Sequence, residues 1–218
     1  MRCTKIDALT HIAIAKWSAG HPALAAFLRL SDAELAFFAT EPDMVYRDNV
    51  VEGDPDSRWY HSRKLDDSGV YVAGAVDAML SSFGIEAYDA RKEGDFERVR
   101  KIIALASHYG VDSQTPWHLA ACMAKTHQEG EETLNIWIDE ALKDLRCEPV
   151  PLSRPRSIGG SVRDACRETW ALFVPRMRDL KSGKELADHR DLSIAVLQRC
   201  AVFSLTVQLA ILQRALGS

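Results

Sequence analysis

The sequence predicts an all-α protein, a single-domain multi-helix bundle over residues 1–218. Apolar residues recur at intervals of three and four along almost the whole chain, and no segment shows the sustained alternation of a β-strand. With 218 residues, of which 47% are hydrophobic and 27% charged, the chain is long enough to bury a large core. No repeat at a fixed period and no low-complexity tract interrupts this pattern.

The periodic segments predict eight helices. They span residues 4–17, 21–38, 69–91, 95–110, 115–126, 129–146, 161–180 and 184–216. Ser31-Asp-Ala-Glu34 has the pattern of a capping box, and Thr115-Pro116 forms a good helix start. Gly110 would allow the helix before it to end there. Residues 40–67 and 146–160 have little periodicity and are expected to form irregular segments, of which the first is long enough to suggest a function.

Charge and cysteine usage make several classes of protein less favoured, although a nucleic acid or lipid substrate stays open. A net charge of −4 gives no electrostatic reason to expect tight binding of nucleic acid or an anionic membrane. The five cysteines are scattered without a CxxC pair, which favours free thiols in a reducing compartment over a structural zinc knuckle. The start of the chain lacks a signal-peptide pattern, and the apolar residues near 194–216 are broken by Gln, Arg and Ser. We expect a cytoplasmic protein, unless a leader has been removed, with no integral membrane segment.

One cluster of side chains carries the chemistry. Five potential metal ligands fall within 24 residues: His108, Asp112, His118, His127 and Glu131. Imidazole and carboxylate are the ligands that zinc prefers in catalytic sites, and a central carboxylate such as Asp112 can bridge two ions. Each residue alone is more often a packed or solvated side chain, but the set of five favours a multinuclear metal site.

The spacing within the cluster agrees with a site between helices. His108 and Asp112 are four residues apart, as are His127 and Glu131, so each pair shares a helix face or meets at a helix end. His118 projects from the first turn of the helix that Pro116 begins. Ligands on facing helices build di-metal sites in helix bundles in this way.

The segment Ser107-His-Tyr-Gly-Val-Asp-Ser-Gln-Thr-Pro-Trp-His118, followed by His127 and Glu131, resembles the central motif of a known family. This is the family of zinc-dependent phospholipases C and single-strand-specific nucleases of the nuclease P1 type. Gln114, Pro116 and His118 follow the motif with small shifts in spacing, and the connection from His118 to His127 is short. The family is all-helical. The matched segments lie within residues 10–131, and the rest of the chain carries no motif of the family.

The resemblance implies a set of zinc ligands that extends upstream. The segments Thr10-His11, Glu41-Pro42-Asp43 and Arg58-Trp59-Tyr60-His61 resemble further family motifs. By position, one zinc ion would take His108, Asp112, His61 and Asp43, and a second would take His118, His127 and Glu131. His11 would help to hold a third, bridged to the first by Asp112. Asp48, Asp54 and Asp56 compete with Asp43 for its place, and Asp48 is closer to the spacing of the secreted enzymes.

The start of the chain departs from the family pattern. Secreted members use the amine and carbonyl of an N-terminal Trp as ligands of the third zinc, whereas this chain begins with Met1 and has no Trp before Trp17. Asp7 lies four residues before His11, on the same helical face. It is a candidate replacement ligand, and an equally good alternative is that it caps the first helix.

The resemblance implies a metal-dependent phosphoester hydrolase, phospholipase C-like, in which two or three Zn²⁺ or other divalent ions activate water. Asp43 and Asp112 are the candidate catalytic residues, with Asp43 as the general base. Candidate substrate-binding residues are Arg47, Arg58 and Arg63 for phosphate oxygens, and Trp59 and Trp117 for stacking a base. The expected substrate is a small-molecule or lipid phosphoester. One alternative is a nuclease or nucleotidase of the same fold. Another is an enzyme that uses the metals in a non-hydrolytic reaction on a small metabolite, or a protein that keeps them only for structure.

Overall fold

The computed structural model describes residues 8–45, 62–120, 123, 127–146, 157–178, 180 and 182–217. Helices dominate these residues, as the apolar periodicity predicts. In chain order the α-helices are α1 (Ala8–Ala19), α2 (Pro22–Leu28), α3 (Asp32–Val45), α5 (Val76–Lys92), α6 (Phe96–Asp112), α7 (Pro116–Leu119), α8 (His127–Leu134), α9 (Ile138–Lys143), α10 (Ile158–Met177) and α11 (Arg190–Leu216). Two 3₁₀ turns, η2 (Asn135–Trp137) and η3 (Gly183–Asp188), and two short strands, β1 (Lys64–Leu65) and β2 (Tyr71–Ala73), complete the described elements.

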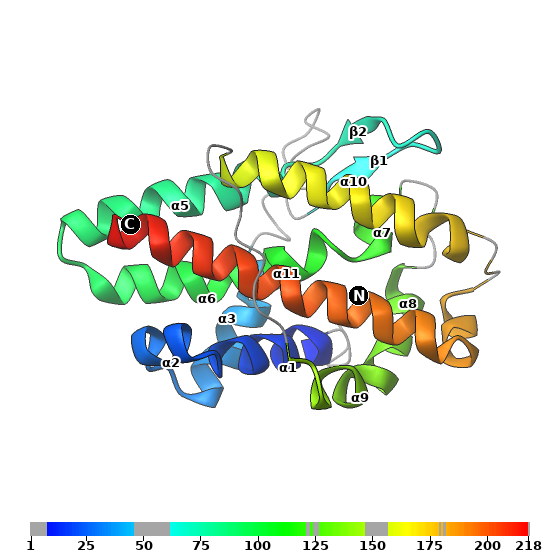
Figure 1. Cartoon of the computed structure of the whole chain (residues 1–218), viewed down its shortest axis with the longest axis horizontal. Coiled ribbons are helices and arrows are strands. Elements are labelled where there is room, and N and C mark those ends of the chain that lie inside the picture. The colour runs from blue at the N-terminus through cyan, green and yellow to red at the C-terminus, as the bar shows by residue number, and fades with distance from the viewer. Residues whose placement is uncertain are drawn as a thin grey trace.

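The C-terminal helix α11 is the centre of the bundle. It crosses the middle of the molecule, with α10 along one side and α1 and α9 along the other (Figure 1). One apolar cluster surrounds its C-terminal half and includes side chains of α2, α5, α6 and α10. A second surrounds its N-terminal half and includes side chains of α1, α8, α9 and η3. The ends of α6, α7 and α8 meet alongside this second cluster.

Local capping fixes several of the helix starts. Asp95 accepts a hydrogen bond from the backbone N–H of Arg98 at 2.9 Å and so begins α6, which carries two of the predicted ligands. The predicted capping box is confirmed, since the Glu34 carboxylate accepts bonds from the Ser31 backbone N–H and hydroxyl, at 2.8 and 2.6 Å. This box begins α3 and not a longer helix. The predicted helix over 21–38 is broken at Arg29, which has a left-handed φ of 50°.

Two alternatives were open for His108 and Asp112, a helix that ends at Gly110 or one that continues, and the structure shows the second, because α6 extends to Asp112. Gly110 instead allows α11 to approach closely: a Cβ there would lie 2.7 Å from the Cα of Ser204. His108 and Asp112 therefore lie one turn apart on a continuous helix. Pro116 does begin a helix, as predicted, but α7 ends at Leu119 and does not extend to residue 126.

The helix predicted over 69–91 begins only at Val76, the start of α5. The residues before it form a β-hairpin. The antiparallel pair of β1 and β2 matches Lys64 with Ala73. Gly74, with φ of 106°, brings the returning chain directly against the Ser62 carbonyl, where a side chain would overlap it. The hairpin thereby fixes residues 62–64 beside α7, and an isolated bridge joins Leu65 to Ala120.

The predicted boundaries of the last helices also shift. The expected helix over 129–146 is divided into α8, η2 and α9, and the one over 184–216 into η3 and α11. Among the described helices, α11 is long and apolar enough to cross a membrane, with a mean hydropathy of 1.7 in its most apolar window. Since 61% of that window is buried inside the protein, its place in the core accounts for its composition.

Candidate metal centre

Six of the predicted site residues come together from five helices. His11 lies on α1, Asp43 near the end of α3, His108 and Asp112 on α6, His118 on α7 and Glu131 on α8. The three imidazoles and Asp112 are almost fully buried, at 1–6% exposure. The site is therefore a polar centre inside the apolar bundle.

The Asp112 carboxylate is the centre of the cluster. Its Oδ2 lies 2.9 Å from His108 Nε2, and its Oδ1 lies 3.3 Å from His11 Nε2 and 3.5 Å from His118 Nε2. Two groups of ligand atoms, each with all members within 4.8 Å of one another, share this carboxylate: His11–His108–Asp112 and Asp112–His118–Glu131. The resemblance implied that Asp112 bridges the ions of His108 and His11; in the structure it also lies in the group of His118.

Two further carboxylates border this centre. Glu131 Oε1 lies 3.1 Å from His118 Nε2, and Asp43 Oδ1 lies 3.5 Å from His108 Nε2. The Asp43 side chain is 36% exposed, whereas that of its neighbour His108 is 0% exposed. Asp43 therefore lies at the border between the cluster and the surface.

Neighbouring polar groups orient two of the imidazoles. His108 Nδ1 lies 2.9 Å from the carbonyl oxygen of Ala39, which can only accept, so Nδ1 carries the proton. His118 Nδ1 forms a hydrogen bond of 2.8 Å with the Ser62 hydroxyl. The His11 and His108 rings are stacked, with centroids 4.3 Å apart. These contacts aim the Nε2 atoms at the carboxylates, as outer partners of metal-bound histidines do.

The electrostatics of the cluster favour a cation. Burial opposes a charge on His108, but the neighbouring Asp112 and Asp43 carboxylates outweigh it and raise the pKa of the imidazole to about 10. Burial likewise opposes the charge on Asp112, but the three imidazoles hold the pKa of its carboxyl well below the usual range. In the protein alone, the buried Asp112 carboxylate is therefore compensated by a proton on His108.

These residues fit a metal ion. Imidazole nitrogens and carboxylate oxygens are the donors that Zn²⁺ prefers, and a cation among them would replace the proton that now offsets Asp112. The buried Nδ1 of His11 has no hydrogen-bond partner among the described residues. This nitrogen is a polar atom of the site that the described protein groups do not satisfy.

Two predicted substrate-binding residues require correction. The Arg63 guanidinium is buried, with Nη1 2.9 Å from Asp77 Oδ1 and its carbon 4.4 Å from the centre of the Tyr71 ring. This ion pair joins the residue before β1 to α5, and the buried guanidinium is not available to bind a phosphate. Trp117 is 1% exposed and packs against Gly130, so its ring cannot stack on a base.

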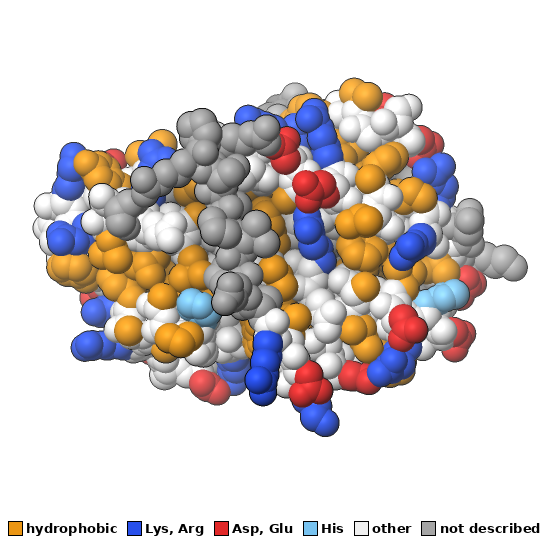
Figure 2. All heavy atoms as spheres, in the orientation of Figure 1, with side chains coloured by type: hydrophobic (Ala, Val, Ile, Leu, Met, Phe, Trp, Pro, Cys, Tyr) orange, Lys and Arg blue, Asp and Glu red, His pale blue; other side chains and the backbone are white. Residues whose placement is uncertain are grey.

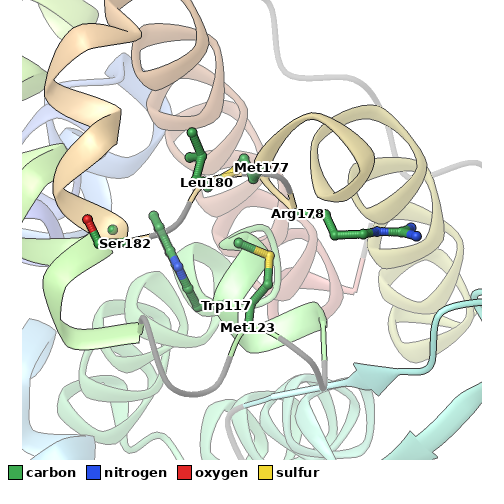
Figure 3. Close-up of a pocket in the computed structure, with 7 residues that line it drawn as sticks. Trp117, Met123, Met177, Arg178, Leu180 and Ser182 are labelled. Carbon is green, nitrogen blue, oxygen red and sulfur yellow. The ribbon is translucent and has the colours of Figure 1, made fainter.

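The Trp117 ring faces a small cavity of about 100 Å³ (Figure 3). The cavity is lined by Trp117, Met123, Met177, Arg178, Leu180, Ser182 and Gly183. In Figure 3 the Arg178 side chain extends away from the others. Trp117 thus belongs to the packing between α7, α8 and η3.

Several predicted residues lie outside the described part of the chain. They are Asp7, Arg47, Asp48, Asp54, Asp56, Arg58, Trp59, His61 and the side chain of His127. Their roles stay predictions from the sequence. Asp43 is the loop carboxylate that the described residues place beside His108, and the choice between it and Asp48 remains as the resemblance left it.

Sequence reasoning missed the residues that hold the ligands. Ser62 and the Ala39 carbonyl have no signature in sequence, because their role depends on contacts between distant segments. Gln114, part of the resembling motif, is fully buried and is not a ligand. Its side-chain oxygen accepts hydrogen bonds from Thr169 and Arg199, which ties the end of α6 to α10 and α11.

With this geometry in place, the chain can be compared with known structures. It is similar to the alpha-toxin of Clostridium perfringens, isolated from an avian strain, with a TM-score of 0.58 and 16% sequence identity. The chain has an alpha-toxin-like helical fold. The match covers 96% of this chain and 62% of the toxin chain, so the chain spans about three fifths of the toxin's length. No protein-family model and no curated sequence matches it.

Proposed function

We propose that this protein is a metal-dependent phosphoester hydrolase of the phospholipase C type. The observation that carries the proposal is the buried Asp112 carboxylate, which two groups of metal-ligating atoms share. The alpha-toxin-like fold and the family motif around His108–His118 support it independently. The preferred ion is Zn²⁺, because the ligand set mixes imidazole with carboxylate.

Divalent ions bound here would lower the pKa of a water molecule and stabilise the negative charge on a phosphoester. The residues of the chain would prepare this chemistry. Asp112 supplies an anion on which two cation sites converge, while the Ala39 carbonyl and Ser62 orient His108 and His118. Asp43, at the exposed border of the cluster, is the candidate general base because its carboxylate can reach both the site and solvent.

The first experiment measures metal content and hydrolysis together. We expect purified protein to contain two or three zinc ions and to hydrolyse a generic phosphodiester such as bis(p-nitrophenyl) phosphate. Asp112→Asn should lose zinc and reduce turnover at least about 100-fold, because the shared anion is removed. The matched control is Asp139→Asn on the exposed surface of α9, which should change neither. Zinc-loaded protein without phosphoesterase turnover would contradict the hydrolytic proposal.

A second comparison identifies the substrate class. We expect a lipid with a choline headgroup to be hydrolysed in preference to single-stranded DNA. Trp117 is buried, and on the face shown in Figure 2 the Lys and Arg side chains are interspersed with Asp and Glu and form no basic stripe. Preferential cleavage of DNA would instead identify a nuclease of the same fold.

A further inference from the structure

Three consecutive residues hold the turn that carries His118. The Arg63 backbone N–H donates to the His118 carbonyl at 3.2 Å, and Lys64 Nζ donates to the Trp117 carbonyl. The Ser62 hydroxyl, fully buried, bonds His118 Nδ1 at 2.8 Å. The imidazole of His118 is thus fixed by a segment more than fifty residues away in sequence.

This support is needed because α7 is only four residues long. A single helical turn has little stability of its own, so its side chains depend on tertiary contacts for their direction. The supporting segment is itself fixed: the Ser62 carbonyl accepts the Val76 N–H at 3.2 Å, and Arg63 pairs with Asp77 at the start of α5. Gly74 packs so closely on the Ser62 backbone that a Cβ at this position would overlap the Ser62 carbonyl oxygen.

The position of Ser62 determines which nitrogen of His118 can bind a metal. His118 Nε2 faces the Glu131 and Asp112 carboxylates, at 3.1 and 3.5 Å. Without a metal, the Glu131 carboxylate oxygen can only accept a hydrogen bond, so the contact at 3.1 Å needs a proton on Nε2. A metal ligand must instead present its lone pair there and keep its proton on Nδ1. Only an acceptor next to Nδ1 stabilises that form, and the hydroxyl oxygen of Ser62 is placed to accept.

We propose that Ser62 is a positioning residue of the metal centre. Its hydroxyl accepts the Nδ1 proton of His118 and thereby holds Nε2 as a metal donor toward Asp112 and Glu131. This inference rests on the proposed function, because it assumes that the cluster binds zinc. It assigns a role to a residue that never touches the ion.

The test combines zinc affinity with a spectroscopic readout that needs no substrate. Chelator competition should show about 10-fold weaker zinc binding in Ser62→Ala, in the range typical for the loss of an outer partner. In the ¹⁵N spectrum of the zinc-loaded protein, the Nδ1–H signal of His118 should be protected from water exchange in wild type and lost in the variant. Ser62→Thr and Ser62→Val form a matched pair of nearly equal shape, of which only Thr, with its hydroxyl, should retain affinity.

Ser193→Ala is the control for the general loss of a buried hydroxyl. The Ser193 hydroxyl donates a hydrogen bond of 3.1 Å to the Leu186 carbonyl and is not part of the cluster. This substitution should leave zinc affinity unchanged. The proposed role of Ser62 is overturned if wild type binds zinc and Ser62→Ala binds it equally tightly. It is also overturned if Ser62→Val binds zinc as tightly as Ser62→Thr, or if Ser193→Ala weakens zinc binding as much as Ser62→Ala does. If wild type takes up no zinc, the proposed function fails as well.

Discussion

At the scale of single residues, Asp112 presents the central energetic problem of this protein. A carboxylate removed from water is costly unless a positive charge and hydrogen bonds compensate it. Three imidazoles lie within 3.5 Å of the carboxylate, and a proton on His108, whose pKa is raised to about 10, provides that compensation. The same arrangement is suited to a divalent ion, which would take the place of the proton. The cost of burying Asp112 is therefore the physical basis of the metal binding that we propose.

Cysteines near the centre give a residue-scale prediction about reactivity. Cys166 and Cys200 are fully buried, and burial raises the pKa of each thiol from 9.0 to about 12. Both should stay protonated at pH 8 and resist iodoacetamide in the native protein, then react on unfolding, because the thiolate is the nucleophile. Peptide-level mass spectrometry with and without denaturant measures this. Rapid native labelling of either cysteine would contradict the burial described here.

These thiols also affect stability at high pH. Their folded pKa values lie above the unfolded ones, so their contribution is present below pH 9 and is lost as pH rises toward 12. The unfolded chain ionises first and is favoured in that range. Replacing both residues with Ala should remove this part of the pH dependence.

At the scale of elements, α6 supports the site by running without interruption past Gly110. Two ligands one turn apart need an intact helix, and that helix must also pack tightly on α11. Glycine meets both needs, because its missing side chain lets the Ser204 backbone approach. Glycine usually destabilises a helix, but at Gly110 the close contact between α6 and α11 offsets this effect.

Substitution of this glycine provides the element-scale prediction. Gly110→Ala should destabilise the protein by about 1–3 kcal/mol, because overpacking against backbone exceeds the gain of about 1 kcal/mol in helix propensity. Gly84→Ala on α5 is the matched comparison, since its Cβ would meet the ends of the Ile158 and Arg214 side chains, which can move. Urea denaturation of both variants measures the difference. A larger loss for Gly84→Ala than for Gly110→Ala would contradict this account of the α6–α11 contact.

At the scale of the whole molecule, the candidate centre joins helices from both ends of the matched segment. α1 contributes His11, while α6, α7 and α8 contribute ligands about a hundred residues later. An ion held by these side chains would therefore link elements that otherwise contact each other mainly through the apolar core. A metal bound at the proposed centre would therefore stabilise the fold in addition to its chemical role.

Removal of metal tests this link. EDTA should lower the Tm of zinc-loaded protein by about 5–10 °C, since an ion present at 100 times its Kd adds about 2.7 kcal/mol to a domain of this size. Differential scanning calorimetry measures the shift, and readdition of zinc should reverse it. Asp112→Asn should show no response to EDTA. An equal Tm with and without metal in wild type would exclude a centre that links the helices.

Periodicity predicted the helical fold, because a helix that buries one face must repeat apolar residues every three or four positions. It also located α6 and α10 to within three residues at each end, and the end of α11 at Leu216, but it placed the start of that helix within η3. It was wrong about residues 69–75, where the contacts of Gly74 and the hairpin override a weak helical pattern. It left open whether α6 ends at Gly110, because sequence does not distinguish a glycine that ends a helix from one that allows a neighbouring helix to approach.

The sequence by itself determined the types of ligand and their spacing, since chemical preference and helical periodicity depend on local residues. It therefore located His108, Asp112, His118 and Glu131 as one group. The tertiary structure alone decided which oxygen faces which imidazole, the removal of Arg63 and Trp117 from the substrate-binding set, and the contact between Ser62 and His118. Each of these depends on contacts between distant segments, and such contacts arise only when the core packs.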